Sequence, residues 1–258
     1  MLRFKSLGSG RSGNATVVQA RSGTQLVHLL VDCGLGIRQL DLRLGRAGML
    51  AEQLDAIFIT HAHGDHIGCA LQLALRNRIP VWMSHGTYSA IGEPDFQGLL
   101  RIASDSVPIE LGALHLHPFT VPHDAREPLQ LRCSDGAAQL GVLTDLGHAT
   151  SHVLEQLTAC SALLLECNHD PELLATSNYP PSLKKRVGGD YGHLANAAAA
   201  AIAQAVQPHG LKQVVAAHLS EQNNRPELAR GVLAAALGCD GADIHVADAA
   251  SGCDWLTA

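Results

Sequence analysis

The chain has 258 residues, of which 47 % are hydrophobic and 16 % are charged, and its formal net charge is −6. This length and apolar content are sufficient for a large buried core. The negative charge disfavours binding of polyanions by the surface as a whole, so any contact with nucleic acid must come from a local basic patch. Aromatic residues make up only 3 % of the chain, which argues against a module built on stacking rings.

Seven scattered cysteines without a C-x-x-C pair indicate reduced thiols and no disulfide framework. The first residues contain no apolar signal region, and no apolar run reaches the roughly 20 residues of a membrane span. We therefore expect a cytoplasmic protein that does not enter a membrane. No linker or internal repeat divides the sequence, and we expect a single domain over residues 1–258.

Apolar runs bounded by turn signals predict alternating strands and helices. The expected strands are residues 27–31, 55–59, 81–83, 107–111, 114–121, 129–133, 139–144, 162–166, 214–217 and 244–246. The expected helices are residues 40–50, 69–76, 151–159, 194–206 and 226–237. Residues 134–136, Ser-Asp-Gly, form a hairpin signal between two of the strands. This alternation indicates an α/β protein of the four-layer αβ/βα sandwich type.

The most informative run is Thr60-His61-Ala62-His63-Gly64-Asp65-His66-Ile67-Gly68, which directly follows an apolar strand. A strand that ends in such a turn can present His61 and His63 to one metal ion, and Asp65 and His66 to a second. Imidazole and carboxylate ligands without thiolate are typical of Zn²⁺, Mn²⁺ or iron in an open, hydrolytic site. The alternative is a histidine-rich loop at the start of a helix.

This run is similar to the signature of the metallo-β-lactamase fold superfamily, a sandwich of two β-sheets with helices on both outer faces. The resemblance implies two divalent ions (Zn or Mn), with the ligands His61, His63, His123, Asp65, His66, His218 and a bridging Asp145. The last three ligands in chain order each follow an apolar strand. Asp32 is implied to hydrogen-bond the histidine loop without binding metal, and a helix N-cap is its alternative.

Two further residues indicate a branch of the superfamily. Glu166 ends an apolar strand, and His193 precedes the alanine-rich helix. The pair is similar to that of the phosphodiesterase branch typified by tRNase Z, where a glutamate orients a histidine near the scissile phosphate. The resemblance implies attack by a metal-bound hydroxide and protonation of the leaving oxygen by His193. We assign Asp65, Glu166 and His193 to catalysis; for His193, a plain residue at the helix start is the alternative.

Together with the segments 8–15, 180–186, 192–196 and 218–224, these motifs resemble the WalJ/YycJ group, bacterial proteins regarded as DNA exonucleases. Substrate contacts are expected from Ser12 and Asn14, in a glycine-serine loop whose amides could form an anion nest. The three-cation run Lys184, Lys185 and Arg186 is expected to contact the phosphate backbone, with a solvated charge cluster as the alternative. We place His169 behind the metal ligands.

The leading hypothesis is a dinuclear metal-dependent phosphodiester hydrolase, most consistent with a DNA exonuclease. A first alternative keeps the metal centre but takes a small cyclic or phosphonate-derived phosphodiester, which suits the weak overall basicity. A second alternative is a thioester or lactone hydrolase of the glyoxalase II type, in which Glu166, His193 and the cation run have no evident role.

Overall fold

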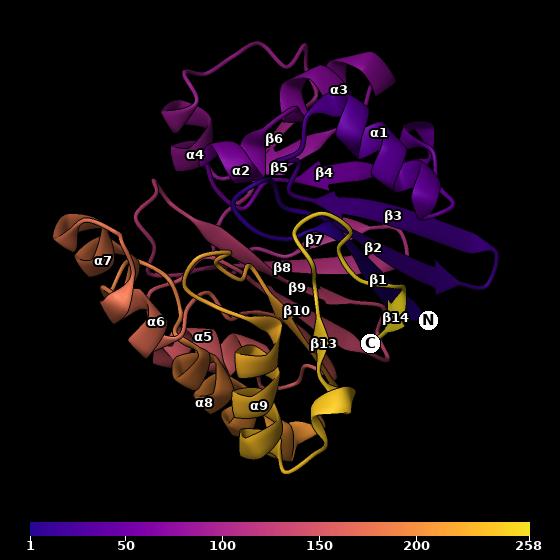
Figure 1. The fold of residues 1–258 in the computed structure, drawn as a ribbon. Helices are drawn as coiled ribbons and strands as arrows, with labels where there is room; N and C mark the ends of the chain where they lie inside the picture. The colour runs from indigo at the N-terminus through magenta and orange to yellow at the C-terminus, as the bar shows by residue number, and fades with distance from the viewer.

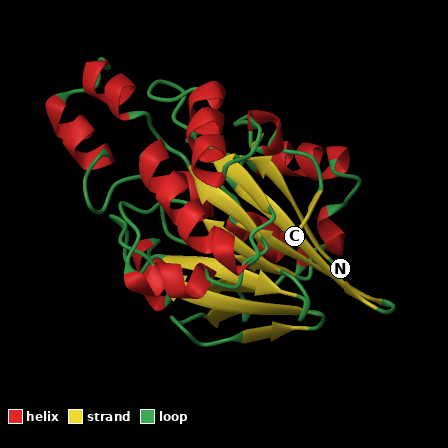
Figure 2. Cartoon of the chain, turned by 90° about the horizontal axis from the view of Figure 1, so that it is seen from below, coloured by secondary structure: helices red, strands yellow, loops and turns green.

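In a computed structural model, which describes residues 1–258, two β-sheets pack face to face and helices cover both outer surfaces (Figure 1). Seen from below, the strands of both sheets lie between the helical layers (Figure 2). The four-layer αβ/βα sandwich expected from the sequence is therefore confirmed.

The first sheet contains the N-terminal strands and has the order β14-β1-β2-β3-β4-β5-β6. Its strands are β1 (Leu2–Gly8), β2 (Ala15–Ser22), β3 (Gln25–Val31), β4 (Ala56–Phe58), β5 (Val81–Met83), β6 (Leu100–Ile102) and β14 (Leu256–Thr257). The pairs β14–β1, β1–β2 and β2–β3 are antiparallel, whereas β3, β4, β5 and β6 run parallel.

The second sheet has the order β13-β12-β11-β10-β9-β8-β7. Its strands are β7 (Ile109–Leu111), β8 (Leu114–Thr120), β9 (Leu129–Ser134), β10 (Gln139–Leu143), β11 (Ala162–Glu166), β12 (Gln213–Ala217) and β13 (His245–Val246). Strands β7 to β10 pair antiparallel and strands β10 to β13 pair parallel. In the parallel half of each sheet, the carboxyl ends of several strands lie at the same edge.

The helices form the two outer layers. Near the first sheet lie α1 (Ile37–Arg46), α2 (Gly64–Ile67), α3 (Ala70–Asn77), α4 (His85–Ala90) and the 3₁₀ turn η1 (Ala51–Gln53). On the side of the second sheet lie α5 (Ser151–Leu157), α6 (Pro171–Thr176), α7 (Pro181–Val187), α8 (Asn196–Val206), α9 (Pro226–Leu237), η2 (Gln207–His209) and η3 (Gly241–Asp243). None of these helices combines the length and the apolar character that crossing a bilayer requires.

The apolar strands read as continuous hydrophobic runs because both of their faces are covered. In β11, Ala162 and Leu164 belong to the cluster between the two sheets, whereas Leu163 and Leu165 pack toward α5, α8 and α9. In β3, the same alternation places Leu29 between the sheets and Leu30 in the cluster with α1 and α3. Three stacked cores therefore hold the four layers together.

Several predicted boundaries are wrong by a few residues. The helix predicted for 40–50 spans Ile37–Arg46, and the alanine-rich helix begins at Asn196 instead of Leu194. Strand β2 and the short helices α4, α6 and α7 were not predicted. The cation run thus lies on a helix, and His193 lies in an extended segment before α8.

Two leucines of α1 test the core between this helix and the first sheet. Leu44 is fully buried, whereas Leu42 is 49 % exposed on the same helix. We expect Leu44→Ala to lower the free energy of unfolding by about 2–5 kcal/mol, because a cavity remains. Leu42→Ala should change it by less than about 0.5 kcal/mol. Urea unfolding of both variants measures the difference, and equal effects would contradict the packing described.

Candidate metal centre

Polar residues gather at one edge of the sandwich because the strands that carry them end there. His61 and His63 follow β4, and His123 follows β8. Asp145 follows β10, Glu166 ends β11 and His218 follows β12, three neighbouring parallel strands. Since parallel strands present their carboxyl ends at the same edge, residues far apart in the sequence meet there.

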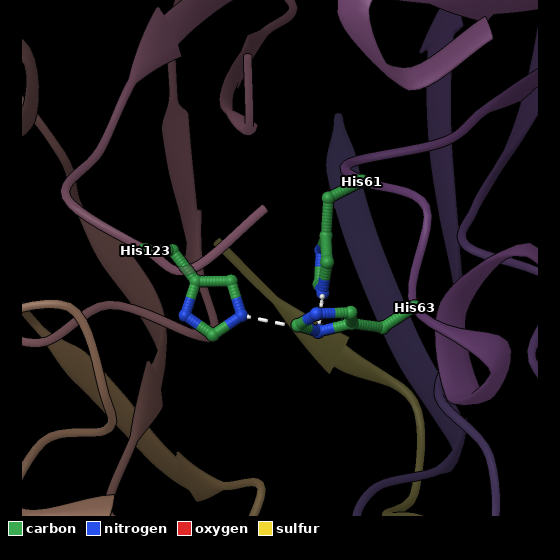
Figure 3. A group of neighbouring side chains, drawn as sticks. All are labelled: His61, His63 and His123. Carbon is green, nitrogen blue, oxygen red and sulfur yellow. Dashed lines mark hydrogen bonds between the residues drawn. The ribbon is translucent and has the colours of Figure 1, made fainter. Parts of the chain in front are cut away.

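The first cluster is formed by His61, His63 and His123, whose rings point toward one another from two parts of the fold (Figure 3). Nε2 of His61 lies 3.0 Å from Nδ1 of His63, and Nε2 of His123 lies 3.2 Å from the same atom. Burial lowers the pKa of His123 and holds the pKa of His61 well below its usual value. Neutral imidazoles with converging nitrogens are the form that binds a metal ion.

The second cluster surrounds the buried carboxylate of Asp145. Oδ2 lies 2.6 Å from Nε2 of His66, and Oδ1 lies 3.0 Å from Nδ1 of His218. Burial alone would raise the pKa of Asp145, but His218 and His66 outweigh it and hold the pKa well below its usual value. Asp65 completes the group, with Oδ2 3.6 Å from Nε2 of His218.

This donor set fits two divalent cations. Asp145 Oδ2 is buried 2.6 Å from Nε2 of His66, so a cation that displaces the proton between them would meet a carboxylate and an imidazole donor. The histidine-only group and the Asp65, His66 and His218 group share no residue, and a third group, His61, His66 and Asp145, connects them, so Asp145 lies between the two clusters. Imidazole and carboxylate donors suit Zn²⁺ or Mn²⁺. The first ion would be held by His61, His63 and His123, and the second by Asp65, His66, His218 and Asp145.

His193 and Glu166 form a pair beside Asp145. Nδ1 of His193 lies 2.7 Å from Oε1 of Glu166 and 3.0 Å from Oδ1 of Asp145. Burial by itself would lower the pKa of His193, but the two carboxylates raise it to about 10. Leu194 N–H also donates to Oε2 of Glu166, which fixes the carboxylate from its other side. His193 is thus an imidazolium at neutral pH, with Nε2 left without a protein partner.

Asp32 lies behind the histidine loop. Its Oδ1 accepts hydrogen bonds from the N–H and Oγ1 of Thr60, and its Oδ2 lies 2.8 Å from Nδ1 of His66. The N-cap alternative is wrong, because α1 is preceded by Gly36 at that position. Asp32, Asp145 and His218 all have φ between 54° and 61°, a left-handed conformation that most side chains avoid. Such backbone strain is typical of functional sites.

The two loops of the first sheet that meet here are in backbone contact. A Cβ atom on Gly34 would lie 1.7 Å from the carbonyl oxygen of Asp65, so only glycine fits. Asn14 connects to the same place, because its N–H donates to that carbonyl oxygen and its Nδ2 lies 3.0 Å from Nε2 of His66. Asn14 therefore lies beneath the ligands.

A cavity of about 500 Å³ opens above the two clusters, and His63, Asp65, Asp145, His193 and His218 form part of its lining. Of the residues predicted to contact substrate, Arg186 lines this cavity, whereas Ser12, Asn14, Lys184 and Lys185 do not. Ser12 is exposed, and Lys184 Nζ donates to the carbonyl oxygen of Ala175.

His169 is buried near Glu166 and His193 without contacting either side chain. Its backbone N–H donates to the carbonyl oxygen of Leu194, and its own carbonyl accepts from Asn196 N–H. Its Nδ1 has no hydrogen-bond partner. The residue therefore holds the segment after His193 and does not reach the cavity.

Several other residues of the cavity wall were not assigned to the site from the sequence. These are Arg11, Asp124, Asn168, Tyr179, Ser220, Gln222 and Asn223. Asp124 follows a predicted ligand directly, and Arg11 lies in segment 8–15, which carries the family resemblance; Ser220, Gln222 and Asn223 lie in segment 218–224, which carries it too. Arg186 Nε lies 2.5 Å from Oδ2 of Asp124. This carboxylate offsets the positive charge of Arg186, which was predicted to contact phosphate.

Comparison with known proteins shows the family to which the chain belongs. A family model described as a β-lactamase superfamily domain matches residues 28–219. The chain belongs to the metallo-β-lactamase superfamily. The crystal structure of the metallo-β-lactamase fold protein YhfI of Bacillus subtilis aligns with a TM-score of 0.74 at 17 % identity, covering 99 % of both chains. At this identity, the likeness supports the fold alone.

Two relatives in this superfamily share more of the sequence. The chain is 33 % identical over 234 residues to a Bacillus anthracis protein named exodeoxyribonuclease YycJ, covering 89 % of this chain and 86 % of that protein. It is 30 % identical over 233 residues to exodeoxyribonuclease WalJ of Streptococcus pneumoniae, covering 88 % and 85 %. The resemblance to the WalJ/YycJ group is thus confirmed.

The two clusters should respond differently to pH when they bind metal. Burial opposes protonation of His66, but Asp145 and Asp32 raise its pKa to about 10, and the pKa of His218 is also raised well above its usual value, mainly by Asp145. A cation must displace those protons, so affinity for the second ion should rise by about tenfold per pH unit for each proton released. The first site, in which burial lowers the pKa of His61 and His123, should change much less above about pH 7.

Titration of the metal-free protein with Zn²⁺ against a chromophoric chelator at pH 6.5, 7.5 and 8.5 measures both affinities. The first site serves as the internal control. Two affinities that rise equally with pH, or not at all, would show that the second cluster does not hold its protons as described.

Proposed function

We propose that this protein is a dinuclear metal-dependent phosphodiester hydrolase that degrades DNA as an exonuclease. The observation that carries the proposal is the pairing of His193 with Glu166 next to Asp145, because a proton donor placed beside the metal ligands can protonate the leaving oxygen of a phosphodiester. The names of the two relatives, both exodeoxyribonucleases, support DNA as the substrate.

The roles follow from the protonation states. Divalent cations bound to the two clusters would polarise the phosphate and lower the pKa of a water molecule toward neutrality. Glu166 keeps the proton of His193 on Nδ1 and orients the ring, so that Nε2 can donate a proton to the departing oxygen. Asp65 lies at the cavity floor, where its carboxylate could orient the attacking water.

The size of the cavity favours a chain end as substrate. Leu183 and Arg186 of α7 line the cavity together with Tyr179 from the connection before this helix. A cavity of about 500 Å³ is in the range for a single small ligand. A terminal nucleotide matches that size better than the interior of a duplex.

The substrate assignment is tested with linear and covalently closed circular duplexes of the same sequence, in the presence of Mn²⁺ or Zn²⁺. We expect the linear form to be degraded from its ends and the closed circle to persist. Cutting of the circle would contradict exonuclease action. Turnover of bis(p-nitrophenyl) phosphate without any loss of DNA would contradict a DNA substrate and favour the small phosphodiester, and turnover of a thioester alone would favour a glyoxalase II-type reaction.

The residue roles are tested by two substitutions that should separate metal binding from proton transfer. Asp145→Asn should lose at least one ion and nearly all activity, because the buried carboxylate joins the ligands. His193→Ala should retain both ions while slowing DNA cleavage by about 10²- to 10⁴-fold, because the proton donor is absent.

Elemental analysis and steady-state rates measure the two effects. His209→Ala, at an exposed histidine of η2, is the matched control and should leave both unchanged. If His193→Ala loses an ion, this histidine is a ligand and its assigned role is wrong.

A further inference from the structure

The loop between β1 and β2 is attached to the metal centre at both of its ends. Ser9 Oγ accepts a hydrogen bond of 2.7 Å from the backbone N–H of His218. At the other end, Asn14 N–H donates to the carbonyl oxygen of Asp65, and its side chain reaches His66. The loop is also closed on itself, because Gly10 N–H donates to Oδ1 of Asn14. Its tip is therefore held in a fixed position relative to the ligands of the second ion.

Arg11 is the charged residue at that tip. Its side chain is exposed, lines the cavity, and makes no ion pair or hydrogen bond in the structure. The other arginine of the cavity, Arg186, is paired with Asp124. Arg11 is consequently the one cavity cation whose charge no carboxylate offsets. The protein supplies no anion to pair with this arginine, although carboxylates are frequent in the rest of the cavity wall. An anionic ligand would supply the missing partner.

We propose that Arg11 is a substrate-binding residue that holds a phosphate of the DNA strand next to the one being cleaved. This inference rests on the proposed function. Guanidinium binds phosphate through two parallel N–H donors and so fixes its orientation as well as its charge. Because Ser9 and Asn14 tie the loop to His218 and His66, a phosphate held by Arg11 has a defined position relative to the cleavage site.

The test compares Arg11→Ala and Arg11→Lys with Arg21→Ala in the presence of Mn²⁺. Arg21 is the matched control, because it is an exposed arginine at the far end of the same hairpin and its side chain makes no recorded interaction. The readouts are kcat and KM for a linear duplex between 50 and 200 mM salt, together with the melting temperature.

Arg11→Ala should raise KM for DNA by roughly tenfold with little change in kcat, since a hydrogen-bonded charge pair is lost. The slope of log(kcat/KM) against log[salt] should become shallower by about 0.9, the value for one duplex phosphate contact. Arg11→Lys should restore the slope, because lysine carries the same charge. It should restore KM only in part, because lysine lacks the two parallel N–H donors of arginine. A purely structural role would shift the melting temperature and leave the slope unchanged.

The outcomes separate this inference from the function on which it rests. If the wild-type protein degrades DNA and Arg11→Ala matches Arg21→Ala at every salt concentration, Arg11 does not bind substrate and the proposed function stands. If Arg11→Ala lowers kcat and the melting temperature with an unchanged slope, the loop is structural and the inference is again overturned. A wild-type protein that degrades no DNA overturns both.

Discussion

The central physical constraint is the burial of Asp145 at the meeting point of the two sheets. A carboxylate removed from water is costly unless opposite charges or cations surround it. Here the compensation comes from His66, His193 and His218, which lie 2.6–3.0 Å from its two oxygens. In turn, Asp32 and Glu166 contact His66 and His193. The placement of one negative charge therefore determines how the surrounding polar residues are arranged.

Much of the fold could be predicted because its strongest signals are local. Val81–Met83, Ala162–Glu166 and Pro226–Leu237 have the predicted limits, each being an apolar run between turn or capping residues. Strand β2 was missed because Thr16 and Gln19 interrupt its apolar pattern, and only tertiary packing buries them. The short helix α6 was also missed, although its start signal is local. Asp170 caps the helix by accepting hydrogen bonds from two backbone N–H groups, and Pro171 occupies the first helical position.

The site could be predicted where its residues are neighbours in the sequence. It was less predictable where the fold brings distant residues together. His61, His63 and His66 lie in one run, but their meeting with His123, Asp145 and His218 was inferred from family resemblance alone. The cation run shows the limit. Successive residues of a helix point about 100° apart, so of the three cations on α7 only Arg186 reaches the cavity, whereas Lys184 donates to the carbonyl oxygen of Ala175. The contribution of Arg11 depends on loop contacts that no periodic pattern reveals.

The origin of the ligands has a mechanical consequence. In the first cluster, His61 and His63 come from the N-terminal sheet and His123 from the other; in the second, Asp65 and His66 face Asp145 and His218 in the same way. Each bound cation would therefore cross-link the two halves of the sandwich at its open edge. Metal binding would then stabilise the contact between the two halves. Removing the ions with a chelator would weaken that contact at the edge where a substrate must enter.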